Sequence, residues 1–280
     1  DLPESLISIG SAAFYGASSL KSLRIPSNVV NIGNQAFQDC TGLTSVVFLN
    51  SMDTIEWDTF SGCTSLTSVT LPSTLLTIAS RAFENCTSLN EIQLPDSIEC
   101  LWEHAFYNCS NLTSVNYPKA WHYTVGNRSP FEGCAITNIV VPEGVTNLAG
   151  GAFGYLTSLK TVELPSTLMV IDDYSFAEAT ELIAVKLGSQ VTSISSNAFD
   201  NHNAKLTFYG ETGSYAETYA KENSISFSSD SFPETLVTLS GRILDREGGG
   251  SMVYALDAKA AAGLSRSIQE GKLEKQYLAV

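Results

Sequence analysis

The chain has 280 residues, of which 44% are hydrophobic and 16% charged, and its net charge at pH 7 is −14. This apolar share is typical of a folded chain and excludes a disordered one. An acidic surface repels phosphate, so we expect no nucleic acid partner, and the sequence has no apolar run of membrane-spanning length.

A phenylalanine recurs along the first two hundred residues at a nearly constant interval. The successive spacings are 23, 23, 23, 23, 25, 22, 23 and 23, for Phe14, Phe37, Phe60, Phe83, Phe106, Phe131, Phe153, Phe176 and Phe199. A fixed period of this size is typical of solenoids, in which each copy buries its core against the next. We therefore predict about nine repeats over residues 1–203.

The clearest repeat covers residues 66–88, LTSVTLPSTLLTIASRAFENCTS. Val69 and Leu71 alternate with polar residues, which predicts a short strand with one buried and one outward side. Pro72 follows at once and ends the strand, because proline has no amide hydrogen to donate to a ladder.

The second half of the same repeat predicts a further strand and a turn. Leu75 and Ile78 indicate another short extended segment. Residues 80–86 are expected to form one helical or 3₁₀ turn that places Ala82 and Phe83 under the core.

Five of the six cysteines lie three residues after the anchor phenylalanine: Cys40, Cys63, Cys86, Cys109 and Cys134. Ala17, Leu156 and Ala179 fill the same position in other repeats, which indicates a small apolar pocket that a free cysteine also suits. Neighbouring repeats lie about 5 Å apart, so distance alone leaves disulfides open, but five residues cannot pair completely. We expect six free thiols.

The pattern L-x-x-V-x-L-P-x-x-L-x-x-I-x-x-x-A-F-x-x-C resembles the BspA-type leucine-rich repeats of bacterial surface proteins and some parasitic protists. The resemblance implies an α/β leucine-rich-repeat solenoid of short parallel strands and short helical turns, mostly strand and loop. Residues 204–227 contain LTFYGETGSYAETYAKENSISF, which resembles the closing unit of such arrays: a strand, a Gly-Ser turn, a short helix and a last strand.

The tail, residues 228–280, does not follow the repeat. Residues 233–244 alternate as a strand does, 247–251 read EGGGS, and 257–278 are rich in helix formers with an apolar face. We expect this helix to dock on the end of the solenoid. The alternatives are that it begins a further domain, or that GGGS is an engineered linker.

Neither a catalytic nor a metal site is indicated. The chain has no CxxC, and its three histidines are scattered, so no zinc site is predicted. It has no nucleophile elbow and no marked carboxylate pair. We expect no catalytic residue, no metal and no cofactor, and hence no enzyme.

Solenoids bind partners on the concave surface of their stacked strands. Of the sixteen outward strand positions that the alternation predicts, four are charged and none is aromatic. This strip therefore holds no obvious hot spot. The polar positions near its centre are our candidates for contact: Glu91, Gln93, Asn116 and Asn138.

The repeat is broken between Phe106 and Phe131, where the spacing grows to 25. Residues 117–123 read YPKAWHY in place of the usual L-P-x-x-L-x-x-I. Aromatic and basic residues on a lengthened loop are typical of a contact site, so we predict binding through Lys119, Trp121, His122, Tyr123 and Arg128. The alternative is that Trp121 and Tyr123 replace the missing leucine and isoleucine in the core.

The resemblance implies a secreted or cell-surface module that adheres to host or neighbouring-cell proteins through the strand face and the 117–129 loop. The partner would be a protein or a glycan on such a cell. No export signal lies in this chain, which begins inside a repeat, so we expect a piece of a longer protein. The alternative is a non-catalytic spacer, or a carbohydrate-binding repeat region, that presents another domain.

Overall fold

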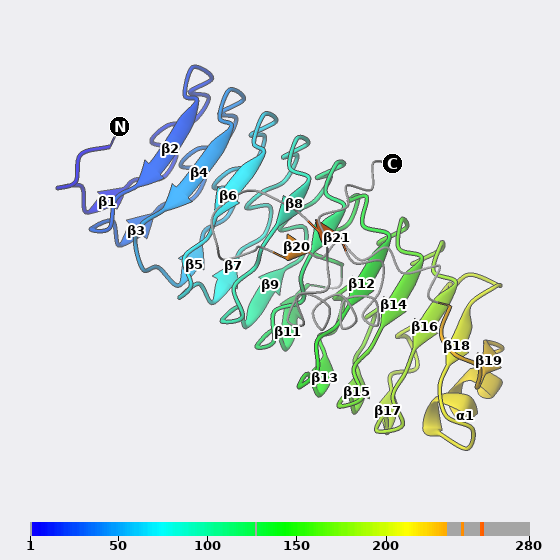
Figure 1. The fold of residues 1–280 in the computed structure, drawn as a ribbon. Helices are drawn as coiled ribbons and strands as arrows, with labels where there is room; N and C mark the ends of the chain where they lie inside the picture. Colours follow the sequence, from blue (N-terminus) through cyan, green and yellow to red (C-terminus); the bar gives the residue numbers. More distant parts are fainter. Residues whose placement is uncertain (1, 127, 234–241, 244–252, 255–280) are drawn as a thin grey trace, which may run out of the picture. The chain divides into compact units, whose positions relative to one another are not determined.

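The computed structural model describes residues 2–126, 128–233, 242–243 and 253–254. The chain divides into two compact units, Asp1–Ser231 and Phe232–Val280. In the first unit the chain winds as a solenoid with two rows of parallel strands, visible in Figure 1 as an upper and a lower row of arrows. The predicted leucine-rich-repeat solenoid is confirmed.

The first row contains the strands that the L-x-x-V-x-L pattern predicts. Strands pair in parallel with a register offset of one repeat, so that Ser22 lies opposite Ser45. Alternation buries Leu23 and Ile25, while their neighbours face outward. The row consists of β2 (Ser22–Ile25), β4 (Ser45–Phe48), β6 (Ser68–Thr70), β8 (Glu91–Ile92), β10 (Ser114–Val115), β12 (Asn138–Val140), β14 (Thr161–Glu163), β16 (Ala184–Lys186), β18 (Thr207–Tyr209) and β19 (Ser226–Ser228).

The second row comes from the predicted second extended segment, and its inward residue is the apolar one, as Ile78 shows. These strands are short, because the chain turns again after two or three residues. They are β1 (Ser8–Ile9), β3 (Asn31–Ile32), β5 (Thr54–Ile55), β7 (Thr77–Ile78), β9 (Cys100–Trp102), β11 (Tyr123–Val125), β13 (Asn147–Leu148), β15 (Val170–Ile171) and β17 (Ser193–Ile194).

The segment around the anchor phenylalanine is a run of β-turns, where the sequence suggested a helical or 3₁₀ turn. Arg81 and Asn85 have positive φ, 60° and 57°, which breaks any helix. Backbone amides alternate in what they bind: Glu84 donates to Arg81 within the turn (3.0 Å), whereas Phe83 donates to Ala105 in the next repeat (2.8 Å). The turns therefore form a third ladder between repeats.

The phenylalanine rings form a stack through the core. Rings from Phe14 to Phe131 lie 5.2–5.4 Å apart, and those of Phe153, Phe176 and Phe199 lie 5.8 and 5.0 Å apart. Offset aromatic pairs of this kind stabilise a core by about 0.5–1.5 kcal/mol each beyond their burial.

The cysteines line the same core as free, buried thiols. Each ladder thiol reaches the carbonyl of the phenylalanine one repeat earlier: Cys63 Sγ lies 3.3 Å from Phe37 O, and Cys109 Sγ lies 3.1 Å from Phe83 O. Burial raises the pKa of Cys40, Cys86 and Cys134, which keeps these thiols protonated.

The solenoid closes with β18, the helix α1 (Tyr215–Glu222) and β19. Ser214 caps the helix by accepting from the Glu217 amide, and the buried face of α1 carries Ala216, Tyr219 and Ala220. Tyr219 packs 6.2 Å from Phe199 and 6.3 Å from Phe208, between ring centroids, and so continues the aromatic core. The boundaries at residues 203 and 227 stay a prediction.

Of the second unit, the structure describes little beyond one antiparallel pair, β20 (Arg242–Ile243) with β21 (Val253–Tyr254). The helix predicted over residues 257–278 lies outside the described residues, as does most of the strand predicted over 233–244.

Candidate binding site

The repeat break that the sequence predicts is also a break in the fold. In the part of the chain that the structure describes, β10 does not pair with β12, and β11 does not pair with β13. Both strand rows are therefore interrupted between the same two repeats. The phenylalanine stack stops there too, since Phe131 stacks on Phe106 while Phe153 stacks on Phe176.

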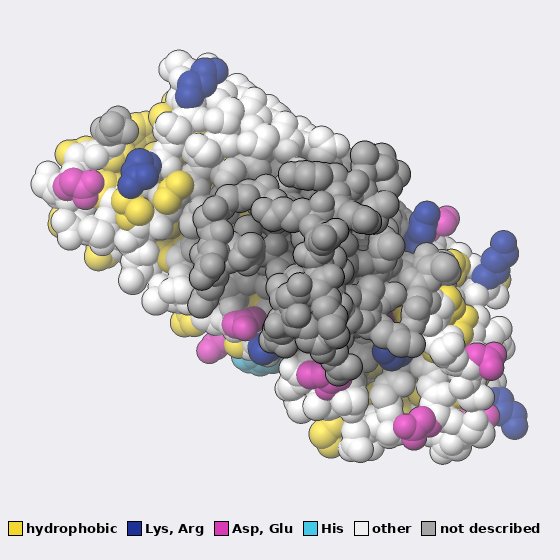
Figure 2. Space-filling model, in the orientation of Figure 1, with side chains coloured by type: hydrophobic (Ala, Val, Ile, Leu, Met, Phe, Trp, Pro, Cys, Tyr) yellow, Lys and Arg dark blue, Asp and Glu magenta, His cyan; other side chains and the backbone are white. Residues whose placement is uncertain are grey.

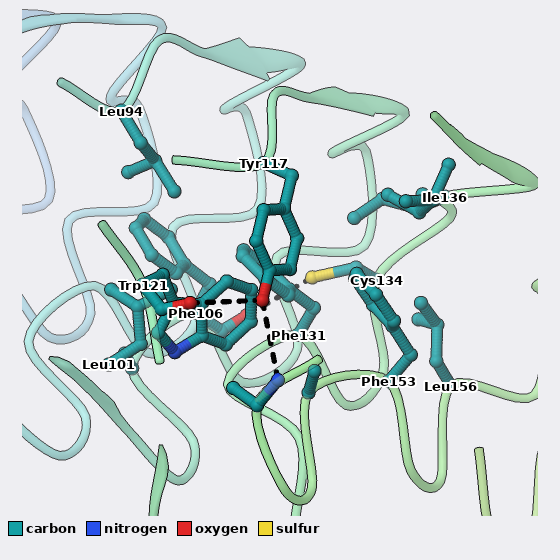
Figure 3. Packing of buried hydrophobic residues seen from close by; sticks show 14 of the residues in the cluster. Leu94, Leu101, Phe106, Tyr117, Trp121, Phe131, Cys134, Ile136, Phe153 and Leu156 are labelled. Atoms are coloured by element: carbon teal, nitrogen blue, oxygen red, sulfur yellow. Dashed lines mark hydrogen bonds between the residues drawn. The ribbon is translucent and has the colours of Figure 1, made fainter. Parts of the chain in front are cut away.

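Trp121 fills this gap (Figure 3). Its ring lies edge-on to Phe131 at 6.2 Å and to Phe153 at 6.1 Å, and only 1% of the residue is exposed. Its indole nitrogen donates to the carbonyl of Tyr123 (2.9 Å), so a large aromatic group is buried here without an unsatisfied donor.

Tyr117 completes the filling from the end of β10. Its hydroxyl donates to the carbonyl of Trp121 (3.1 Å) and accepts from the amide of Ala149 in the next repeat (3.3 Å), as drawn in Figure 3. Burial raises the pKa of Tyr117, so this hydroxyl stays protonated. One side chain thus bridges the two halves of the solenoid.

Trp121 replaces the consensus leucine, but Tyr123 does not replace the isoleucine. The register places Thr124 opposite Leu101 in the isoleucine position, and Tyr123 opposite Cys100 on the outward side. Tyr123 is 44% exposed, whereas the hydroxyl of Thr124 is buried without a hydrogen-bond partner. The repeat break therefore exposes an aromatic ring and leaves one polar group unsatisfied.

The basic residues of the loop lie in different surroundings. Lys119 and His122 are exposed, and they lie four residues and one residue before Tyr123 in sequence. Arg128 is engaged instead: it pairs with Glu132 (2.9 Å) and its guanidinium lies 4.2 Å from the centre of the Tyr155 ring. His104 contacts the other oxygen of Glu132 at 3.1 Å.

The four candidates on the first strand row also differ, since some are exposed and one is engaged in hydrogen bonds within the solenoid. Glu91 and Gln93 are exposed at β8, and Asn138 is half-buried. The amide of Asn116 is occupied, since it donates to the Leu94 carbonyl and accepts from the Leu94 amide, both at 2.8 Å. Positions 161 and 184, which the alternation also placed outward, are buried.

Figure 2 shows the charge distribution on the face that carries both strand rows. The upper edge of this view, beyond β4, β6 and β8, is mainly white, which denotes uncharged polar side chains and backbone. Acidic, basic and histidine side chains gather at the lower edge, beside β9 and β11.

A hollow that the sequence did not predict lies beyond the carboxyl ends of β5, β7, β9 and β11. It has a volume of about 380 Å³ and is lined by Trp57, Asp58, Ser80, Arg81, Trp102, Glu103, His104 and Val125. The rings of Trp57 and Trp102 meet at 5.5 Å with an angle of 60°. A sequence signal existed, because these are two of only three tryptophans and they sit where other repeats carry small or polar residues.

Comparison with known proteins identifies the family. A profile of the BspA type leucine-rich repeat region matches six copies over residues 1–113, 32–155 and 124–246. The chain belongs to this family. BspA type repeats are a repeat class of solenoid fold, and the regular positions described above are those of its core.

Three solved structures are similar to this chain, and the first of them supports the fold. A leucine-rich repeat protein from T. pallidum is 26% identical with a TM-score of 0.51, over 62% of this chain and 82% of that one. One from Eubacterium ventriosum is 32% identical with a TM-score of 0.47, over 52% of this chain and 38% of that one. A leucine-rich cell surface protein from Faecalibacterium prausnitzii is 24% identical with a TM-score of 0.36, over 81% of each chain. Among curated proteins, the comparison finds no match.

The described residues contain no group of three or more side chains that could hold a metal ion. Within the same residues, no helix has the length and apolar character needed to cross a membrane.

Proposed function

We propose that this BspA type chain is a non-catalytic binding module of a secreted or cell-surface protein, which adheres to proteins on a host or neighbouring cell. The observation that carries the proposal is the outward position of Tyr123, which is 44% exposed with its ring centroid 4.8 Å from that of the exposed His122; Lys119, four residues earlier in the same loop, is also exposed. Tyrosine is one of the residue types that dominate binding energy in protein interfaces.

The arrangement favours contact over catalysis. Trp121 and Tyr117 fix the backbone that carries Tyr123, so the exposed ring is held without a large loss of conformational entropy on binding. Glu91 and Gln93, exposed at β8 of the first strand row, supply further contacts in this proposal. Trp121 itself acts as support in this proposal, and Asn116 and Arg128, already engaged, add contacts at the margin.

The test is surface plasmon resonance with the full chain against purified collagen, laminin and fibronectin. We expect saturable binding to at least one of them. Tyr123→Ala should raise the Kd about 30-fold, which corresponds to the ~2 kcal/mol of a hot-spot residue. Tyr15→Ala removes another exposed tyrosine, 56% exposed in the first repeat, and should leave the Kd unchanged.

Two outcomes would overturn the proposal. Absence of saturable binding to all three proteins would favour the spacer alternative. Equal loss of binding in Tyr123→Ala and Tyr15→Ala would show that the surface around Tyr123 has no special part in it.

A further inference from the structure

The Trp57–Trp102 hollow is built by residues from four successive repeats. Neighbouring repeats are about 4.8 Å apart, so residues two repeats apart start roughly 10 Å from each other. The indole rings nevertheless meet at 5.5 Å, so the gap over the intervening repeat is closed by the tryptophan side chains. That repeat carries Ala79 and Ser80 there, and such small side chains leave room for the two rings.

The lengthened loop forms one wall of the hollow. Val125 of β11 lies opposite Trp102 of β9 in the parallel register, and the Glu103 amide donates to the Val125 carbonyl (2.8 Å). Gly126 follows with φ 108°, and a Cβ at this position would overlap the Glu103 carboxylate. The glycine therefore permits the close approach that places Glu103 at the rim.

The rim combines aromatic faces with both hydrogen-bond donors and hydrogen-bond acceptors. Trp57 is 47% exposed, and the Arg81 side chain is 58% exposed. Asp58 and Glu103 supply acceptors, Arg81 supplies donors, and the Ser80 hydroxyl supplies both. Five of the eight lining residues are polar, which is more than in an ordinary apolar ligand pocket.

We propose that this hollow binds a glycan. A pyranose ring has one face of C–H groups, which packs on an indole because the aromatic face is electron-rich. Its hydroxyls are donors and acceptors at once, so carboxylates, a guanidinium and a hydroxyl can all be satisfied by the same ring. The volume, about 380 Å³, is that of a small-molecule site.

Other ligand classes fit less well. The net charge of −14 and the carboxylates of Asp58 and Glu103 disfavour an anionic ligand. A cation would be attracted by the two carboxylates and the indole faces but repelled by Arg81, whereas a neutral sugar can use all of these groups. A proline-rich peptide binds grooves lined mainly by aromatic side chains, and here the polar residues outnumber the aromatic ones.

The experiment is a glycan microarray probed with the full chain, followed by isothermal titration with the oligosaccharide that gives the strongest signal. We expect one structurally related group of glycans to bind saturably. Trp57→Ala and Trp102→Ala should each weaken binding at least tenfold. Ser80→Trp should do the same, because it fills the hollow with a bulky side chain and removes the Ser80 hydroxyl while both tryptophans remain.

Tyr174→Ala is the matched control, because Tyr174 is 36% exposed in a later repeat, away from the hollow. It should bind as the unchanged chain does. The proposal would be overturned if the unchanged chain gave no glycan signal above that of a Trp57→Ala/Trp102→Ala double variant. It would also be overturned by glycan binding that survives Ser80→Trp in a protein whose Tm is unchanged, or by competition from a proline decamer but from no soluble glycan.

The inference is independent of the protein-binding surface around Tyr123. The two tryptophan variants should keep their affinity for matrix proteins, and Tyr123→Ala should keep its affinity for the glycan. The glycan proposal and the protein-binding proposal can therefore fail separately, because each has its own assay and its own variants.

Discussion

At the scale of single residues, hydrogen bonding explains why cysteine is the commonest residue three positions after the anchor phenylalanine. Alanine or leucine fills the volume of this pocket, as Ala17 and Leu156 do. A thiol adds a weak donor that reaches the phenylalanine carbonyl of the preceding repeat, at 3.1–3.3 Å along the ladder. The ladder thus joins adjacent repeats without disulfides.

Protonation of this ladder makes stability depend on pH. Burial raises the pKa of the Cys63 thiol from 9.0 to about 12, with a smaller contribution from Cys40. Between these values the unfolded chain loses a proton that the folded chain keeps, so stability falls as pH rises. At pH 10.5 we expect a loss of roughly 2 kcal/mol from Cys63 alone, because each unit of pKa shift corresponds to about 1.4 kcal/mol.

Guanidinium unfolding of the unchanged chain and of Cys63→Ala, at pH 7, 9 and 10.5, checks this prediction. Groups that titrate in both proteins cancel in the comparison. Cys63→Ala should be the less stable protein at pH 7 and should lose this disadvantage by pH 10.5. A stability difference that stays constant across the three pH values would contradict the prediction.

Thr124 is a polar residue in a position that the repeat consensus fills with isoleucine. It occupies an isoleucine position with its hydroxyl buried and unpartnered, which costs a protein about 1–3 kcal/mol. Thr124→Val removes the hydroxyl at nearly constant shape, so we expect a gain of about 1 kcal/mol in the free energy of unfolding. Chemical denaturation measures it.

Thr59→Val is the matched control for that experiment. Thr59 is also buried, but its hydroxyl donates to the Glu56 carbonyl at 2.7 Å. The same substitution should therefore destabilise the protein at this position. If both variants shifted stability in the same direction, the unsatisfied hydroxyl would not be the cause.

At the scale of elements, the sequence predicted those features of the fold that depend on the alternation and the period of apolar residues. Both strand rows, their buried sides and the repeat break follow from apolar residues at fixed spacing. The turns around the phenylalanine did not follow. Their left-handed positions, as at Arg81 and Asn85, hold several residue types and only sometimes glycine, so no residue marks the conformation.

The candidate site was predictable only in part, for a related reason. Tyr123 and its neighbours stand out because they interrupt a repeat. Trp57 and Trp102 do not interrupt it, and they are 45 residues apart, so their contact depends on which way two side chains lean over Ser80. The period gives the distance between repeats, but side-chain direction comes from packing in three dimensions.

At the scale of the whole solenoid, each repeat contacts mainly its neighbours, so stability is approximately a sum of repeat and interface contributions. One interface differs from the rest in the described residues, because both strand rows stop there, whereas the breaks between β6 and β8 and between β3 and β5 each affect one row only. Between β10 and β12, and between β11 and β13, the strand ladders are interrupted, and Trp121 and Tyr117 carry the connection. We therefore expect this interface to be the weakest point for cooperative unfolding of the first unit.

Trp121→Ala should uncouple the repeats on its two sides. Truncation of a buried tryptophan costs about 3–5 kcal/mol, and here the loss falls on a single interface. The tryptophans left are Trp57 and Trp102, both before the break, so fluorescence follows only those repeats while circular dichroism follows the whole chain. The two signals should coincide in guanidinium unfolding of the unchanged chain and separate in Trp121→Ala. Leu168→Ala, in an uninterrupted part of the core, should lower stability and keep one transition. Coincident signals in Trp121→Ala would show that the remaining contacts across the break are enough to couple the halves, among them the Ser129 hydroxyl, which donates to the Ala152 carbonyl (2.8 Å).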